Sequence, residues 1–90
     1  MSKERIYKHF GEAEQLKRLA KACGKLAYAC GELRANKNPE TIAYLIRKIA
    51  NVEFLTEQIK DYYKCEDQVY IRKYRLLDEL VKEIEDLINR

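Results

Sequence analysis

The fold is decided by residues 16–33, which read LKRLAKACGKLAYACGEL. Small and apolar side chains recur there at spacings of three and four residues, at Leu16, Leu19, Ala20, Cys23, Leu26, Ala27, Cys30 and Leu33. Because side chains at this spacing share one face of a helix, the stretch predicts an amphipathic helix from about Glu12 to Arg34. Gly24 and Gly31 lie inside it and each costs up to about 1 kcal/mol against alanine. We therefore expect these glycines to mark the close approach of another helix or of a ligand.

Two further helices follow. Asn38-Pro39-Glu40 is a typical helix start, with an N-cap, a proline at the first helical position and an acid in the first turn. Helical spacing of apolar residues continues to about Tyr63, and the next turn is expected at residues 64–66. A third helix is traced by Val69, Leu76, Leu77, Leu80, Val81, Ile84, Leu87 and Ile88. Short loops place neighbouring helices antiparallel, so we expect one all-α domain over residues 1–90, an antiparallel helical bundle of three main helices.

The small size of the chain limits the core that it can form. Ninety residues make one domain with a modest core. A composition of 47% hydrophobic and 37% charged residues, with three Gly and one Pro, favours helices and argues against disorder. Three long apolar stripes are more than such a monomer can cover. We therefore expect a homodimer or homotetramer in which the bundle is completed between chains.

The sequence also indicates a compartment. No apolar run approaches the roughly 18 residues of a membrane span, and residues 1–5 show no signal-peptide pattern. Cys23, Cys30 and Cys65 are odd in number and have no CxxC spacing, which favours reduced thiols in a cytoplasm. Because Cys23 and Cys30 fall in the apolar stripe, we expect them to be small core residues. No membrane partner is expected.

Three segments carry a resemblance to a known family. They are residues 9–15 (HFGEAEQ), 21–26 (KACGKL) and 49–53 (IANVE). In this order they resemble the compact, phage-type MazG-like all-α nucleoside triphosphate pyrophosphohydrolases, and the resemblance extends from about residue 6 to residue 87. The family has Gly-x-x-x-Gln before its first helix, here Gly11 to Gln15. A lysine near the start of the third helix matches Lys73.

The resemblance breaks down at the residues that carry the family's chemistry. The family uses an ExxE pair and an ExxD pair on facing helices to hold Mg²⁺, which neutralises the triphosphate and activates water. These positions fall here on Ala22 and Lys25, and on Lys48 and Asn51, none of which is a carboxylate. Of the motif acids, Glu53 alone is kept. The resemblance therefore implies a catalytically inactive member, with no metal and no cofactor.

Bases stand where the family has acids. Lys21, Lys25, Arg47 and Lys48 would contact phosphate directly, in place of the metal. Arg47 and Lys48 are adjacent and point about 100° apart, so we expect only one of them to reach the centre of the cleft. The expected phosphate ligands are Lys21, Lys25, Arg47, Lys48, Asn51 and Lys73.

Aromatic side chains are candidates for stacking on a base. Seven tyrosines in ninety residues is a high number, and Tyr7, Phe10 and Tyr62 stand near the ends of the predicted helices. They could stack on a nucleotide base. The alternative, packing at helix ends, is favoured for any single one of them. His9 has no partner at catalytic spacing, and we assign it no catalytic role.

Several functions remain open. The first is a nucleotide-binding protein that does not hydrolyse its ligand. Because compact relatives occur in phages, the resemblance implies one use for such a protein: it would sequester a nucleotide messenger and act as a counter-defence sponge. The second is a protein-interaction module or enzyme inhibitor whose basic cleft docks an acidic protein. Nucleic acid is disfavoured, because fifteen acids nearly balance eighteen bases. An active pyrophosphatase would need an unfamiliar metal site.

Overall fold

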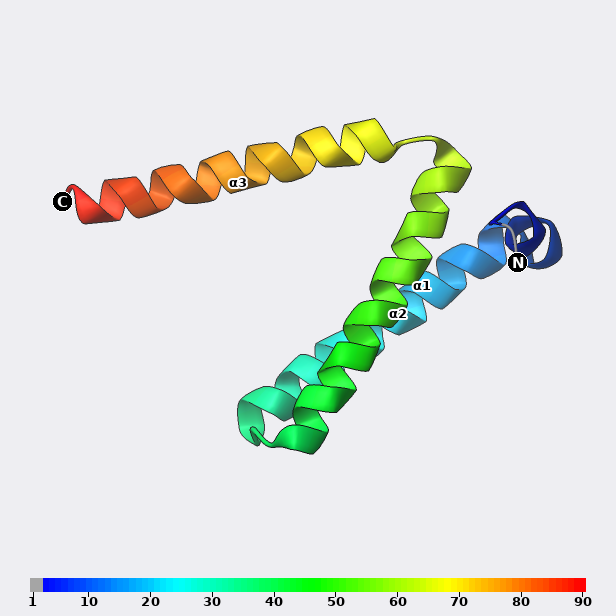
Figure 1. The fold of residues 1–90 in the computed structure, drawn as a ribbon, viewed down its shortest axis with the longest axis horizontal. Coiled ribbons are helices and arrows are strands. Elements are labelled where there is room, and N and C mark those ends of the chain that lie inside the picture. The colour runs from blue at the N-terminus through cyan, green and yellow to red at the C-terminus, as the bar shows by residue number, and fades with distance from the viewer. Residues whose placement is uncertain (1–2) are drawn as a thin grey trace.

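Three helices make up nearly all of the chain. The computed structural model describes the backbone of residues 3–90 and the side chains of residues 11–90. The helices are α1 (Lys3–Ala35), α2 (Pro39–Tyr63) and α3 (Glu66–Ile88), and residues 3–90 contain no strand. Figure 1 shows α1 and α2 side by side as an antiparallel hairpin, with α3 leaving the end of α2. The prediction of an all-α fold with three main helices is confirmed.

Gly11 divides α1 into two parts. Its backbone angles are φ 74° and ψ 168°, which are not helical. Glycine adopts a positive φ without the steric cost that a Cβ atom imposes. The long second part of α1 therefore begins at Glu12, as predicted, while the helical residues before Gly11 were not predicted.

The start of α2 matches the prediction. The Oδ1 atom of Asn38 accepts a hydrogen bond from the backbone N–H of Thr41 at 2.9 Å, and the Thr41 Oγ1 accepts one from the N–H of Asn38 at 3.0 Å. Pro39 is the first residue of the helix. This reciprocal capping satisfies backbone donors that the first turn leaves without helical partners. The cap fixes the point at which the chain reverses from α1 into α2.

The contact between α1 and α2 uses one edge of the predicted stripe of α1. Leu19, Leu26 and Leu33 were predicted and are half-buried, whereas the buried Gln15, Ala22 and Ala29 were not predicted; together these six residues alternate at spacings of four and three. Facing them, α2 supplies the half-buried Leu45, Lys48, Val52, Leu55 and Ile59. Ala22 and Ala29, with 8% and 0% of their surface exposed, are the buried apolar residues of the described part of the chain.

The prediction that Cys23 and Cys30 are core residues is therefore wrong for the single chain. Both are exposed, and Cys65 is half-buried. The apolar side of α1 is broader than one neighbouring helix can cover, and α2 covers the edge that contains Ala22 and Ala29. The expectation for Gly24 and Gly31 is also wrong within the chain, because a Cβ atom built on either would meet nothing within 4 Å.

The direction of α3 follows from the turn that precedes it. Lys64 adopts a left-handed conformation, with φ 54° and ψ 44°, and its N–H donates to the carbonyl of Asp61 at 3.3 Å. After this turn α3 projects away from the hairpin (Figure 1). Of its residues only Val69 is half-buried, and the others are exposed. The radius of gyration is 16.9 Å, against about 12 Å for a compact domain of this length.

None of the described helices combines the length and the apolar character that crossing a membrane would require.

The capping box yields a testable prediction. Replacing Asn38 with alanine removes the acceptor for the Thr41 N–H, and N-cap replacements of this kind cost about 1 kcal/mol. We expect Asn38→Ala to lower the free energy of unfolding by that amount in urea denaturation followed by circular dichroism. The matched control is Asn36→Ala, which leaves the box intact because Asn36 contributes only its backbone carbonyl to Thr41. Equal stability of the two variants would show that the box does not stabilise the hairpin.

Candidate functional site

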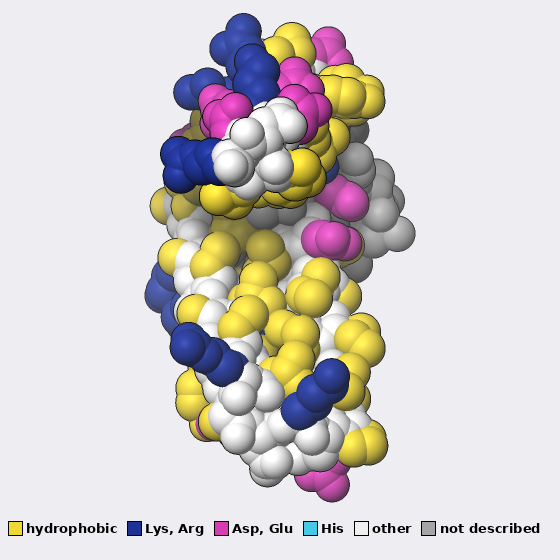
Figure 2. All heavy atoms as spheres, turned by 90° about the vertical axis from the view of Figure 1, so that its left-hand side faces the viewer, with side chains coloured by type: hydrophobic (Ala, Val, Ile, Leu, Met, Phe, Trp, Pro, Cys, Tyr) yellow, Lys and Arg dark blue, Asp and Glu magenta, His cyan; other side chains and the backbone are white. Residues whose placement is uncertain are grey.

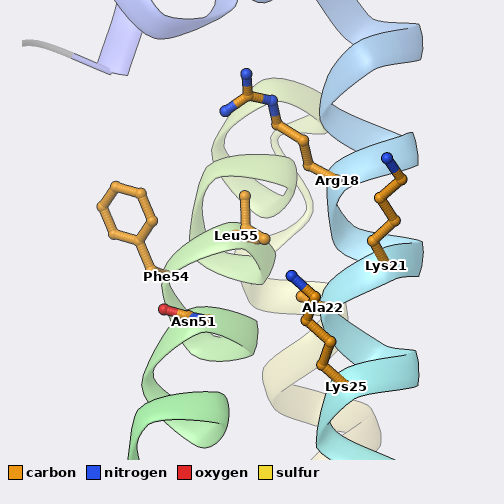
Figure 3. Close-up of a pocket in the computed structure, with 7 residues that line it drawn as sticks. All are labelled: Arg18, Lys21, Ala22, Lys25, Asn51, Phe54 and Leu55. Atoms are coloured by element: carbon orange, nitrogen blue, oxygen red, sulfur yellow. The ribbon is translucent and has the colours of Figure 1, made fainter.

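A basic cleft lies between α1 and α2 on one face of the hairpin. Arg18, Lys21 and Lys25 come from α1, where spacings of three and four residues put them on the same side of the helix. Asn51 and Phe54 come from α2, three residues apart. With Ala22 and Leu55 these side chains line a volume of about 330 Å³. The cleft therefore has a cationic wall and a wall with an amide and an aromatic ring (Figure 3).

The chemistry of the lining suits an anionic ligand with an apolar part. None of the seven lining residues is acidic. The Nε atom of Arg18 lies 3.4 Å from Oε1 of Glu14, one turn earlier on α1, so this guanidinium is oriented by a carboxylate outside the lining. Phe54 is 58% exposed, and its ring projects from α2 on the far side of Asn51 from the lysines (Figure 3). Cations thus stand at one wall and a ring face is available at the other.

A second cluster of cations and aromatic rings lies one turn nearer the loop of the hairpin. The Tyr28 and Tyr44 rings are 6.4 Å apart, edge to face, and join α1 to α2. Lys48 Nζ lies 5.0 Å from the centre of the Tyr44 ring, and Arg47 Cζ lies 5.7 Å from it, which are cation–π distances. A hydrogen bond with Glu32 raises the pKa of Tyr28. We call this cluster and the cleft together the basic face.

The structure brings some of the predicted phosphate ligands together and separates others. Lys21, Lys25 and Asn51 line the cleft. Arg47 and Lys48 stack on Tyr44 and are not among the residues lining the cleft. Lys73 lies on α3, where it lines a different hollow with side chains that include Lys60, Glu66 and Asp67.

Three residues of the cleft were missed in the sequence: Arg18, Phe54 and Leu55. The signal for Arg18 was present, because it is three residues before Lys21 and so shares its face of the helix. Phe54 is likewise three residues after Asn51 and so shares its face of α2. Once one ligand on each helix is assigned, helical spacing identifies these neighbours.

The tyrosines at the end of α2 hold a carboxylate of α1. The Tyr62 hydroxyl donates to Glu12 Oε2 at 3.1 Å, and the Tyr63 hydroxyl donates to Glu12 Oε1. These bonds link the last turn of α2 to the start of the long part of α1, which supports the packing alternative for Tyr62. Tyr7 and Phe10 lie outside the residues whose side chains the structure describes.

Two amides are buried next to these tyrosines. Gln15 and Gln58 are 1% and 3% exposed, and Gln15 Oε1 and both polar atoms of the Gln58 amide have no hydrogen-bond partner in the described part of the chain. Gln15 is the glutamine of the Gly-x-x-x-Gln segment. It faces the interior of the hairpin and is not among the residues that line the cleft.

Comparison of the chain with models of protein families, with curated proteins and with solved structures finds no match. The resemblance to MazG-like proteins therefore stays a prediction. Among the described residues, no three His, Cys, Asp or Glu side chains are grouped as they would be around a metal ion.

The pair of tyrosines on Glu12 gives a prediction about pH. The hydrogen bond with Glu12 raises the pKa of Tyr63 to about 12 from an ordinary value of 10.0. A raised pKa means that the bond stabilises the fold below pH 10, and that this stabilisation is lost as the pH rises through about 12. We expect tyrosinate absorbance to show a component that titrates near pH 12 and that disappears in Tyr63→Phe. The control Tyr44→Phe should retain it; a late component that survives in Tyr63→Phe would contradict the assignment.

Proposed function

We propose that the protein binds a phosphorylated nucleotide in the cleft between α1 and α2 and does not hydrolyse it. The observation that carries this proposal is the cationic wall of Arg18, Lys21 and Lys25, which faces Asn51 and Phe54 with no acidic residue in the lining. Lysine and arginine form strong, charge-assisted hydrogen bonds with phosphate. An aromatic ring with an exposed face stacks on any base.

Charge repulsion within the basic face favours the same ligand. Residues 15–31 and 41–52, which supply most of this face, contain six bases and no acid, while Glu14 and Glu32 flank it next to Arg18 and Tyr28. Like charges gathered on one surface destabilise the folded state. A bound phosphate group relieves that repulsion, so the free energy of ligand binding adds to the free energy of unfolding.

The absence of hydrolysis follows from the residues at the equivalent catalytic positions. The resemblance assigns Ala22, Lys25, Lys48 and Asn51 to the positions of the four metal-binding acids. Two of these residues are cationic and none is a carboxylate, so the side chains repel Mg²⁺ instead of holding it. A protein that binds a nucleotide without consuming it can sequester a nucleotide messenger. We propose that role, as in phage counter-defence, for a homo-oligomer in a cytoplasm.

A protein-interaction module is the second candidate. It is favoured by α3, whose large apolar side chains are exposed from Tyr70 to Ile88. In this alternative the basic face docks an acidic protein and the cleft has no small-molecule ligand.

Ligand binding can be tested with a charge reversal. We expect at least one member of a panel of mono-, di-, tri- and cyclic nucleotides to raise the melting temperature in buffer without magnesium. Each charge-assisted hydrogen bond contributes about 1.5–3 kcal/mol, so Lys25→Glu should weaken binding by at least roughly tenfold in calorimetry. The control Lys82→Glu makes the same charge change on α3, which projects away from the hairpin (Figure 1), at a residue that does not line the cleft, and should bind nearly as tightly as the parent. If no nucleotide in the panel raises the melting temperature, the interaction module becomes the leading candidate.

The fate of the ligand is a separate prediction. After incubation with Mg²⁺ and denaturation of the protein, we expect chromatography to recover the bound nucleotide intact, with no pyrophosphate or phosphate released. The reason is that none of the seven described residues lining the cleft is a carboxylate that could hold the metal and activate water. Release of pyrophosphate or phosphate by protein purified to homogeneity, abolished by a chelator, would refute this part of the proposal. The proposal of a binding site would remain.

A further inference from the structure

The single chain exposes more surface than a compact domain of its mass. Its accessible surface is 7626 Å², whereas a compact monomer of 10.7 kDa exposes about 5,500 Å². The excess of roughly 2,000 Å² exceeds the roughly 800 Å² that each partner contributes to a standard protein interface. The chain therefore carries enough uncovered area for an extensive contact.

One part of this area is an apolar face of the hairpin, opposite the basic face. It consists of Leu16, Ala20, Cys23, Ala27 and Cys30 from α1, and of Ile42, Ile46 and Ile49 from α2, all exposed. These residues lie about 100° around each helix from the packed stripe, on the side away from Lys21 and Lys25. Figure 2 shows apolar side chains gathered along the middle of the hairpin, on the side toward which α3 projects. Small residues on α1 beside isoleucines on α2 form a surface suited to another helix.

The other part is the apolar face of α3. Tyr70, Tyr74, Leu77, Val81, Ile84 and Ile88 follow one another at alternating spacings of four and three, and all are exposed. This is the spacing of a helix that packs lengthwise against other helices. At about 1.5 Å per residue, the 23 residues of α3 span about 35 Å, close to the length of the 25-residue α2.

The charge of α3 argues against its pairing with a second α3. Residues 76–88 of α3 contain five acids and one base. Like charges brought together at an interface are destabilising, which disfavours α3 packed on α3 and favours the uncharged apolar face of the hairpin.

Within one chain α3 does not cover the hairpin. Beyond its first turn, α3 projects away from α1 and α2 (Figure 1). We propose that the occupant of the apolar face is α3 of a second copy, and that two chains exchange these helices around a two-fold axis. Each chain carries both complementary surfaces, as an isologous dimer requires. The exchange turns each hairpin into a three-helix unit, and because it uses the face opposite the cleft it leaves the cleft open. The proposal does not depend on nucleotide binding.

The experiment uses the native thiols of the hairpin as markers. One chain carries Ile84→Cys with Cys23→Ser, Cys30→Ser and Cys65→Ser, so its only thiol is on the apolar face of α3. The other chain carries Cys65→Ser alone and keeps Cys23 and Cys30 on the hairpin. The two are co-expressed with tags of different size and treated with a short bismaleimide cross-linker without ligand. Any product that contains both tags joins α3 of one chain to the hairpin of the other.

We expect a major cross-linked product with both tags, and a dimer in sedimentation at micromolar concentration. The matched control is Glu79→Cys in place of Ile84→Cys, about 140° away from Ile84 around α3, and it should give several-fold less product. Leu77→Asp with Ile84→Asp should give a monomer that still binds any nucleotide ligand. A helical monomer for the parent chain overturns the proposal. A dimer in which Ile84→Cys gives no more cross-linked product than Glu79→Cys also overturns it. So does a dimer in which the chain that carries Ile84→Cys cross-links chiefly to a second copy of that same chain.

Discussion

The close contact between α1 and α2 at Ala22 and Ala29 is the constraint on which the rest of the structure depends. Because both side chains are small and buried, the two helix backbones approach closely along this line. The capping box at Asn38 sets where the chain reverses and so helps to fix which residues of the two helices meet. The contact also fixes the rotation of each helix about its axis. A rotation of α1 by one residue, about 100°, would move Lys21 and Lys25 out of the cleft and Cys23 and Cys30 toward α2.

The contact gives the hairpin two faces of different character. On one side, the cations of α1 line the cleft with Asn51 and Phe54, and Arg47 and Lys48 of α2 lie over the ring of Tyr44. On the other side, alanines and cysteines of α1 lie next to isoleucines of α2. The proposed ligand and the proposed second copy use different faces. A chain with this arrangement can bind an anion on one surface and assemble through the other, without competition for the same residues.

The hairpin and α3 differ in what stabilises them. In the single chain α3 has its own backbone hydrogen bonds and almost no tertiary contact, whereas most helices in proteins are stabilised chiefly by the packing of an apolar face. A partner that covers the apolar side of α3 would supply burial that the single chain lacks, so assembly and the folding of α3 would be coupled. The polar interior at Gln15 and Gln58 adds little to stability within the described part of the chain, because the buried Gln15 Oε1 and both polar atoms of the Gln58 amide have no hydrogen-bond partner there and carry a desolvation cost.

The sequence by itself determined the helices, their approximate ends and the absence of acids on the basic face. These properties are local: the cap at Asn38 and the periodic apolar residues act over a few residues. It also identified Lys21, Lys25 and Asn51 as members of the cleft. Leu19, Leu26 and Leu33 belong to both the predicted stripe and the packed one. Only the tertiary structure decided which edge of this apolar side is packed. Ala22 and Ala29 on one edge, and Cys23 and Cys30 on the other, have the same spacing of seven residues, so periodicity does not distinguish them. The direction of α3 depends on the left-handed backbone conformation of Lys64. Lysine does not by itself predict this conformation, which glycine and asparagine adopt more readily.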